Sequence, residues 1–433
     1  MMTVPYDIEN QIDSLKKYYK KIKVEKGGAT YKVVQDCIMS GIALFSLKYP
    51  SLLQFNESRN DEMTIHNLNL LYKIDFIPSD TYMREVLDEV NPHDIRSGFK
   101  RLFSILQTSK KIRDYTYIDD CYLLAIDGTG FFKSKTIKCN NCCKTEHKNG
   151  TVTYHHNMVT GAIVHPNKKG VIPLCPEPIV KQDGVTKNDC EMNAVTRFLN
   201  DFRREHPHLK TTILEDALFG KAPHIRHLES LKLEYIIGVK SSDHRYLFKE
   251  VSDSKNTQTI EIIDEDNILH RYTFLNKVSL NKSNLDVKVN FMEYSQLKEG
   301  ETVRYFSWIT SHSISRNNVA LLVKSGRSRW KIENETFNTL KNQDYHFEHN
   351  FGHGHKYLST VLSFLMMIAF LIDQIQLIGS IKFKKALEKT KSKVSLWFKI
   401  RSLFINFFIK SWNDLFLSIS NKHLGAVLTP DTS

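Results

Sequence analysis

Apolar and polar residues along this chain form a repeated pattern, in which a largely apolar run leads into an aspartate. Residues 122–126 (YLLAI) lead into Asp127 and Gly128, and residues 211–215 (TTILE) lead into Asp216. Such a run indicates a strand covered on both faces, and a glycine after the acid leaves room for a ligand beside the backbone. An Asp–Gly pair can also end a strand simply as a turn. The second run favours a functional role, because two such strands can bring their carboxylates together at one edge of a sheet.

A helix with a charged face is predicted over residues 327–341 (RSRWKIENETFNTLK). Helix formers dominate this segment, and Arg329 and Glu333 are spaced to pair on one face. The helix therefore adds a further acid to the two that end the strands. Carboxylates held close together in a folded protein repel each other, and a divalent cation relieves that repulsion.

Two strand-borne aspartates followed by a helix that reads R-W-x-I-E resemble the DDE transposases of bacterial insertion sequences, in particular the large group with a β-rich insertion before the final Glu. The resemblance covers roughly residues 120–355 and is most specific in the last motif. It implies cleavage of double-stranded DNA at the terminal inverted repeats and transfer of the 3′-hydroxyl into target DNA, by a homodimer on paired ends. The catalytic, metal-binding acids that it implies are Asp127, Asp216 and Glu333. The DNA-binding residues that it implies are Arg329 and Lys341.

The expected cofactor follows from this chemistry. Phosphodiester cleavage needs an activated nucleophile on one side and a stabilised leaving oxygen on the other, and two Mg²⁺ ions about 4 Å apart provide both. We therefore expect two Mg²⁺ ions, with Mn²⁺ as a substitute, bridged by Asp127. Two alternatives remain, a transposase-derived DNA-binding protein without catalysis and a ribonuclease-H-like nuclease without strand transfer; the intact acids argue against the first. Glu177 and Glu191 are extra acids; either could support the metal-binding acids from behind, but we interpret them as surface acids.

The chain departs from the group's pattern at two positions. Gly326 stands where the pattern has a tyrosine, three residues before Arg329, which questions any role of that tyrosine in positioning a flipped base or a hairpin end. Lys341 lies eight residues after Glu333 instead of seven, which leaves Glu335 as a rival for the third carboxylate. On a helix that turns about 100° per residue, Glu333 shares a face with Arg329 and Glu335 does not, so we expect Glu333 to be the ligand.

The order of the predicted elements is that of a ribonuclease-H-like fold, an α/β class with a mixed sheet. Strands at 151–164 and 171–174 follow the first acid-bearing strand, a helix at 188–206 precedes the second, and a strand at 233–239 comes after it. From about residue 241 to residue 310, apolar and polar residues alternate in stretches that turn residues separate. This pattern predicts the β-rich insertion. A chain of 433 residues is too long for one ordinary core. The expected domains are a helical, DNA-binding domain at 1–115, the catalytic domain with its insertion at 116–355, and a helical, basic region at 356–433.

Charge and hydropathy narrow the class of protein. A formal net charge of +12 favours a polyanionic partner and is compatible with nucleic acid. The most apolar run, residues 361–372, is shorter than the roughly 20 residues that cross a bilayer, so we expect a buried helix there. The N-terminus lacks the pattern of a signal peptide, and we expect a protein of the bacterial cytosol, associated with the nucleoid. Basic and aromatic residues interleave over 382–408. They could grip DNA, or they could form the two faces of ordinary helices.

A cysteine-rich loop lies between the first two predicted strands. Its candidate ligands for a structural zinc ion are Cys139, Cys142, Cys143 and His147. Thiolates and imidazoles suit tetrahedral zinc, but such sites normally take ligand pairs from separate segments, and His155 or His156 could complete this one across the hairpin. The alternative is a loop of reduced cysteines, because seven cysteines in a cytosolic protein do not indicate a disulfide framework.

Overall fold

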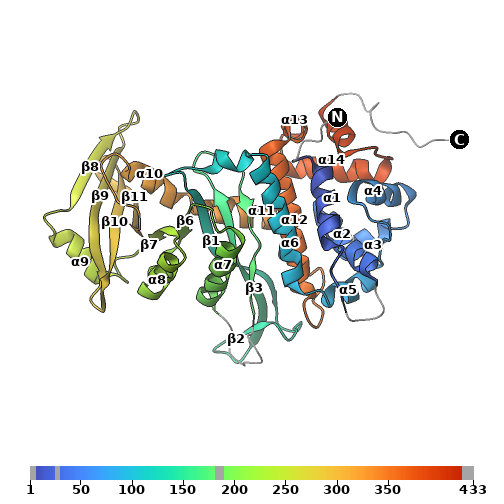
Figure 1. The fold of residues 1–433 in the computed structure, drawn as a ribbon, viewed down its shortest axis with the longest axis horizontal. Helices are drawn as coiled ribbons and strands as arrows, with labels where there is room; N and C mark the ends of the chain where they lie inside the picture. The colour runs from blue at the N-terminus through green and yellow to red at the C-terminus, as the bar shows by residue number, and fades with distance from the viewer. Residues whose placement is uncertain (1–5, 25–29, 181–189, 422–433) are drawn as a thin grey trace.

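The structure, a computed structural model, describes residues 6–24, 30–180 and 190–421. The molecule is elongated, with a four-stranded insertion at one end, a central sheet, and a body of helices at the other end (Figure 1). The N-terminal helices (blue) and the C-terminal helices (red) lie together at the helical end.

Within the described residues, the strands of the core and of the insertion form one mixed sheet. The strands are β1 (Tyr122–Ser134), β2 (Cys143–Glu146), β3 (Val152–Val164), β4 (Ile172–Pro173), β5 (Glu177–Ile179), β6 (Thr211–Glu215), β7 (Glu234–Gly238), β8 (Gln258–Ile263), β9 (Leu269–Asn281), β10 (Asn284–Lys298) and β11 (Glu301–Thr310). Their order is β2-β3-β1-β6-β7-β11-β10-β9-β8, and β4 and β5 also pair with β3. β3 is antiparallel to β1. β6 is parallel to β1, and β7 is parallel to β6. This is the predicted ribonuclease-H-like mixed sheet.

The insertion continues the core sheet instead of forming a separate layer. β11 pairs antiparallel with β7, with Trp308 opposite Gly238 and Thr310 opposite Ile236. β11 is therefore the strand that returns the chain from the insertion to the core. The structure adds β9, a strand that the sequence pattern did not indicate.

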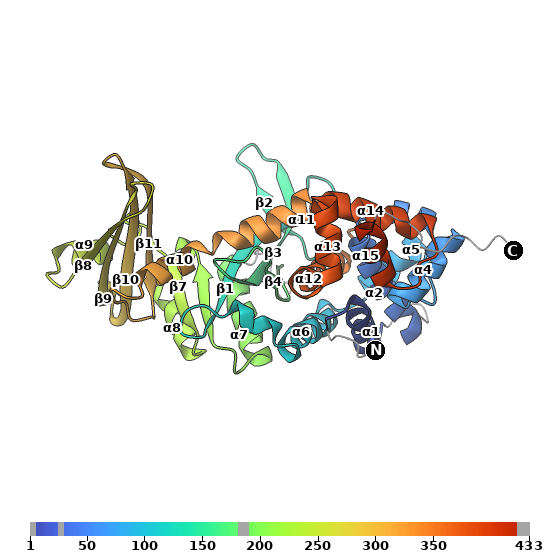
Figure 2. The same ribbon diagram turned by 90° about the horizontal axis from the view of Figure 1, so that it is seen from above.

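Helices cover both faces of the sheet and build the helical body. The helices before the sheet are α1 (Ile8–Tyr19), α2 (Tyr31–Ser46), α3 (Leu52–Ser58), α4 (Glu62–Tyr72), α5 (Asp80–Asp88), α6 (Pro92–Thr108) and η1 (Lys111–Tyr115). Those within and after it are α7 (Glu191–Glu205), η2 (Ala217–Phe219), α8 (Ala222–Ser230), α9 (Arg245–Asp253), α10 (Val319–Arg327), η3 (Ile332–Phe337), α11 (Asn338–Asn342), α12 (Leu358–Gly379), α13 (Ile381–Thr390), α14 (Lys393–Asn406) and α15 (Trp412–Ser420). Figure 2 shows α7 and α8 on one side of the sheet and the line from α10 to α11 on the other.

The N-terminal and C-terminal helices share one core, at whose centre lies α12. This helix is long and apolar enough to cross a membrane, but 89% of its most apolar stretch is buried in the protein. It packs against α2, α5 and α6. The buried Lys48 ammonium pairs with Asp373 of α12 at 2.8 Å, and Asn67 of α4 donates to the carbonyl oxygens of Phe404 and Phe407 at 2.7 Å. The predicted buried helix is confirmed, while the domain boundaries stay a prediction.

The aromatic residues of the basic C-terminal helices divide between the core and the surface. Trp397 and Phe404 are buried in the helical body, at 4% and 0% exposure. Phe398, between them on α14, is 64% exposed. Most of this aromatic surface therefore serves packing, and Phe398 is available to a partner.

Candidate active site

Asp216 follows the end of β6, whereas Asp127 lies within β1, which continues to Ser134 and pairs there with β3. The expectation that the first strand ends at its acid is therefore wrong. β1 and β6 run parallel with Ala125 opposite Leu214, so the two aspartates, each two residues further on, lie side by side in register. The backbone N–H of Gly128 donates to Asp127 Oδ1 at 3.0 Å. Asp216 caps η2, where its Oδ1 accepts from the N–H of Leu218 at 2.9 Å. Each carboxylate keeps an oxygen that these backbone contacts do not use.

Glu333 lies near Asp127, on the helical segment η3 between α10 and α11. The turn η3 that carries it is π-helical and packs against β1; π-turns are rare and frequently mark functional sites. Arg329 Nη2 lies 2.5 Å from Glu333 Oε1, and Arg329 Nη1 lies 3.3 Å from Asp127 Oδ2. The guanidinium thus bridges a strand-borne and a helix-borne carboxylate.

Glu335 lies on the same turn but faces a different environment. Its charge acts on the ammonium groups of Lys331 and Lys393, where it opposes the lowering of their pKa by burial. Glu333 instead acts on Asp127, whose pKa it raises. The two glutamates therefore act on different charged groups, Glu333 on Asp127 and Glu335 on the two lysines.

A fourth carboxylate, that of Glu191, completes the cluster. A Cβ atom on Gly128 would come within 2.7 Å of the Glu191 carboxyl carbon, so the glycine makes room for this acid. Burial, followed by repulsion from Asp127 and Asp216, raises the pKa of Glu191. The interpretation of Glu191 and Glu177 as surface acids is wrong. Glu177 is 8% exposed and pairs with Arg197 at 2.5 Å, away from the cluster.

The electrostatics of the cluster fit a divalent cation. Burial raises the pKa of Asp127, and repulsion from Glu333 and Asp216 adds to this rise. Arg329 and the Gly128 amide act in the opposite direction. Carboxylate oxygens gathered at this density are the donors that Mg²⁺ and other hard cations prefer.

Comparison with known families identifies the fold. A family model described as "Transposase DDE domain" matches residues 122–371, which is more than half of the chain. The chain belongs to the DDE transposase family. The match begins with β1 and ends within α12, so it includes Asp127, Asp216 and Glu333. No curated protein matches the chain.

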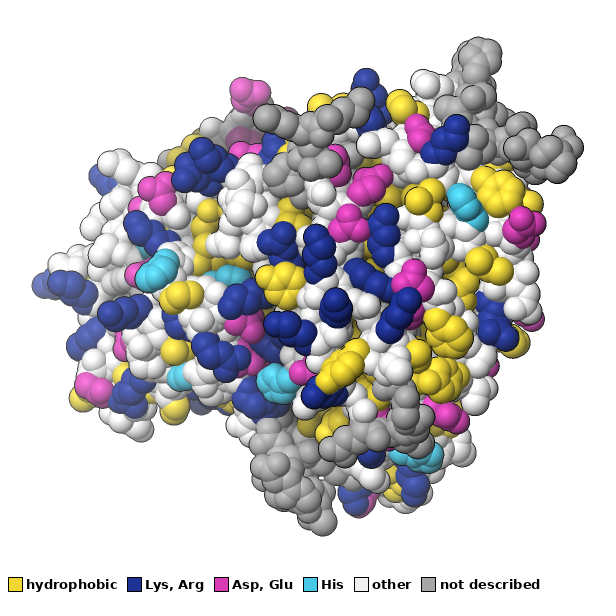
Figure 3. All heavy atoms as spheres, turned by 45° about the vertical axis from the view of Figure 1, so that its right-hand side comes forward, with side chains coloured by type: hydrophobic (Ala, Val, Ile, Leu, Met, Phe, Trp, Pro, Cys, Tyr) yellow, Lys and Arg dark blue, Asp and Glu magenta, His cyan; other side chains and the backbone are white. Residues whose placement is uncertain are grey.

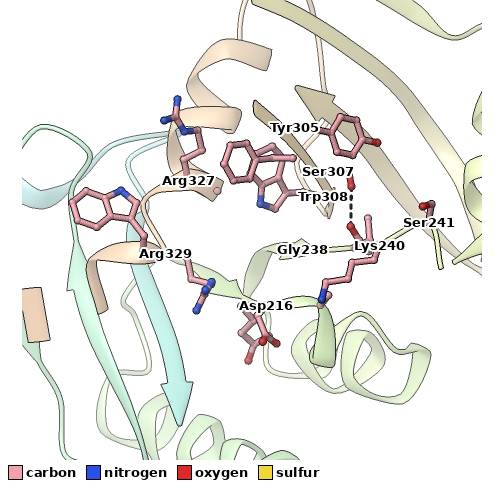
Figure 4. A pocket seen from close by; sticks show the side chains of 15 residues that line it. Asp216, Gly238, Lys240, Ser241, Tyr305, Ser307, Trp308, Arg327 and Arg329 are labelled. Atoms are coloured by element: carbon pink, nitrogen blue, oxygen red, sulfur yellow. Dashed lines mark hydrogen bonds between the residues drawn. The ribbon is translucent and has the colours of Figure 1, made fainter. Parts of the chain in front are cut away.

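A hollow of about 450 Å³ opens beside Asp216 in this transposase. Figure 4 shows Arg329 and Lys240 on either side of Asp216, with Trp308 and Tyr305 above them from β11. Among the residues that line the hollow is Gly326. A Cβ atom there would lie 2.9 Å from the Trp308 indole, so tight packing excludes a tyrosine at this position.

Lys341 lines a second hollow, which runs along the paired strands β1 and β3. That hollow begins at Gly130, three residues after Asp127 on the same strand. Lys341 Nζ pairs with Glu348 Oε1 at 2.9 Å, and Lys133 lies on the same wall. Basic side chains therefore flank the route that leads along the hairpin to the acids.

The predicted zinc ligands do not stay together. Cys139 and Cys142 lie side by side, but Cys143 begins β2 and its thiol contacts the carbonyl oxygen of Ile179 at 3.5 Å. His147 Nε2 lies 2.8 Å from Thr153 Oγ1, across the hairpin. Strand pairing carries both residues away, so the ligand set with Cys143 and His147 is wrong.

Proposed function

We propose that this transposase cleaves DNA at the ends of its element and transfers the freed 3′-hydroxyl into target DNA, with divalent metal held by Asp127, Asp216 and Glu333. The observation that carries the proposal is the meeting of these acids, from two parallel strands and one helix, beside basic hollows. Bound Mg²⁺ supplies an activated nucleophile and a stabilised leaving oxygen.

The reaction consists of two displacements at phosphorus. In the first, water attacks the phosphodiester at the element end, the bond to the 3′ oxygen breaks, and a 3′-hydroxyl and a 5′-phosphate result. In the second, that 3′-hydroxyl attacks a target phosphodiester, loses its proton, and releases a 3′-hydroxyl on the target strand. Both steps exchange one phosphodiester oxygen for another, so one set of carboxylates serves both.

Each acid has a role that its position supports. Asp127 neighbours both Glu333 and Asp216 electrostatically, so we assign to it the central place among the acids that would hold divalent metal. Arg329 holds Asp127 and Glu333 in place before metal binds. Metal held by these acids would compensate their charge, and the Arg329 guanidinium would then be available to a DNA phosphate, for which its fork geometry is suited. Lys341 contacts a phosphate further along the hairpin.

The surface charge supports a long DNA contact. Figure 3 shows Lys and Arg side chains spread over the face of the helical body, among fewer Asp and Glu. A hollow at α1 and α2 has several lysines in its lining, which are Lys16, Lys17, Lys20, Lys21, Lys23 and Lys32. Phosphate contacts of this kind bind DNA without regard to sequence and weaken with salt. We propose double-stranded DNA as the partner, a homodimer on paired ends as the active form, and the bacterial cytosol as the location.

The test compares Asp127→Asn and Asp216→Asn with the exposed turn variant Asp266→Asn, using the DNA that flanks the gene as substrate. Loss of a metal ligand should reduce Mg²⁺-dependent cleavage by more than about a thousandfold. Affinity for the same DNA should change by less than about threefold, because phosphate contacts dominate it. Near-normal cleavage by either active-site variant would refute the assignment. Cleavage without joining of pre-cut ends to a plasmid would instead indicate a nuclease.

A further inference from the structure

Four thiol and imidazole side chains from separate segments meet where the β2–β3 hairpin joins the body of the protein. Cys139 and Cys142 come from the loop before β2, His156 from β3, and His353 from the loop before α12. Their four ligand atoms all lie within 4.8 Å of one another. Cys142, His156 and His353 are buried, at 1%, 1% and 9% exposure.

The spacing of these atoms matches a tetrahedral zinc ion. The two sulfur atoms are 3.8 Å apart, which is about the tetrahedral edge for Zn–S bonds of about 2.3 Å. The sulfur–nitrogen separations are 3.3 Å and 3.4 Å to His156 and 3.2 Å to His353, a few tenths of an ångström below the roughly 3.6 Å of a mixed edge. A disulfide needs sulfurs about 2.05 Å apart, and the two cysteines are free.

The surroundings are those of a structural site. The backbone N–H of Cys139 donates to Cys142 Sγ at 3.4 Å, which stabilises a thiolate. The ring of Phe132 lies 4.3 Å from that of His353, and Phe131 stacks at 5.7 Å from His156, so aromatic rings shield the cluster. Separate thiol–imidazole hydrogen bonds would each bring only one pair of atoms together. Here all four ligand atoms lie within 4.8 Å of one another.

The loop that brings His353 into the cluster is held by the N-terminal helices. Gly354 has φ +66°, a conformation that favours glycine, and a Cβ atom there would meet Asp88 at 2.3 Å. Asp88, at the end of α5, accepts four backbone N–H bonds of 2.8 to 3.0 Å from the start of α12. The helical body therefore helps to set the position of His353, and Asn141 of the cysteine loop also contacts this segment by donating to the carbonyl oxygen of Lys356.

We propose that Cys139, Cys142, His156 and His353 bind one structural Zn²⁺, which fastens the β2–β3 hairpin to the loop before α12. The ion closes a connection of almost two hundred residues along the chain between His156 and His353. Two thiolates and two imidazoles fill a tetrahedral shell and leave no position for substrate. The site thus holds β3 against the helical body, and β3 in turn pairs with β1, the strand that carries Asp127.

The test is metal analysis of the full chain purified without chelators, which should contain close to one zinc per chain. Cys142→Ser and His353→Gln should each lower that content to less than about a fifth and lower the melting temperature by several degrees. Cys143→Ser and His147→Gln are matched controls, since the same hairpin carries them outside the cluster, and both should keep zinc. Asp127→Asn should also keep it, which separates this site from the catalytic one.

Three results of the zinc analysis would overturn the proposal. They are wild-type protein without zinc, full zinc in His353→Gln, and loss of zinc in Cys143→Ser alone. Because a ligand variant could fail to fold, cobalt exchange into the wild-type protein gives an independent measurement. Co²⁺ in this shell should show the strong visible absorption of a tetrahedral ion with thiolate ligands. A weak octahedral spectrum would equally contradict the ligand set.

Discussion

The two proposed metal-binding clusters each take one side chain from the paired strands β1 and β3, and they differ in donor type, exposure and access. On β1, Asp127 stands opposite Thr160 of β3, and five residues later Phe132 stands opposite His156. The Asp127 and Glu333 side chains are 21% and 47% exposed, whereas His156 is 1% exposed. The carboxylate group is open and holds a displaceable arginine between its acids; the Cys–His group is closed.

This difference separates an exchangeable site from a permanent one. Mg²⁺ keeps several of its waters and binds through few carboxylates, which leaves room for phosphate oxygens. Zinc in a shell of two thiolates and two imidazoles has no open position and contributes to folding. One hairpin can therefore carry chemistry at one end and an anchor at the other, because the donor atoms decide which ion each end takes.

The largest expected effect distinguishes the two glutamates of η3. Glu333→Gln should lose Mg²⁺-dependent cleavage by several orders of magnitude, because the amide is a poor substitute for a metal-binding carboxylate. Glu335→Gln should cost no more than about tenfold, or roughly 1.4 kcal/mol of barrier. A cleavage assay in Mg²⁺ and Mn²⁺ on a pre-cut end measures both. A dead Glu335→Gln beside an active Glu333→Gln would show that the wrong face of the helix has been assigned.

A smaller effect is expected at Glu191. Its carboxylate approaches Gly128 and feels Asp127 and Asp216, so it either helps to hold metal or positions those that do. Glu191→Gln should reduce cleavage by about ten- to a hundredfold and raise the Mg²⁺ concentration needed for half-maximal rate. Glu205→Gln, at the far end of α7, is the matched control for the metal requirement. An unchanged Mg²⁺ dependence in Glu191→Gln would remove it from the site.

The contrast between these residues shows what a sequence can reveal here. Asp127 and Asp216 can be recognised because each directly follows an apolar run, and parallel pairing of those two runs then brings the acids close together. Glu333 can be recognised because it lies four residues after Arg329, and the two side chains pair although the turn is π-helical. Glu191 gives no such signal, since its approach to Gly128 depends on how α7 packs against the sheet. Only the glycine after Asp127 hinted that something comes close.

The zinc ligands illustrate a longer-range limit. The cysteine pair and the candidate His156 can be read locally, because one turn and one hairpin join them. His353 lies far along the chain, and its place depends on the cap that Asp88 forms on α12. A histidine between Gly352 and Gly354 was the available clue, since glycines on both sides permit a close approach. Because this tertiary contact cannot be seen in the sequence, the sequence pattern indicates Cys143 and His147 as the remaining ligands, on their proximity in sequence alone.

The smallest expected effect tests whether the two ends of the hairpin are independent. In His353→Gln, loss of zinc should lower the melting temperature, yet the Mg²⁺ concentration for half-maximal cleavage should shift by less than about threefold. The reason is that Asp127, Asp216 and Glu333 are positioned by β1–β6 pairing and by η3, which the variant leaves unchanged. The measurement is a Mg²⁺ titration of cleavage well below the variant's melting temperature, with the Cys143→Ser protein in parallel. A tenfold shift confined to His353→Gln would mean that the anchor sets the geometry of the catalytic metal site as well as the stability of the hairpin.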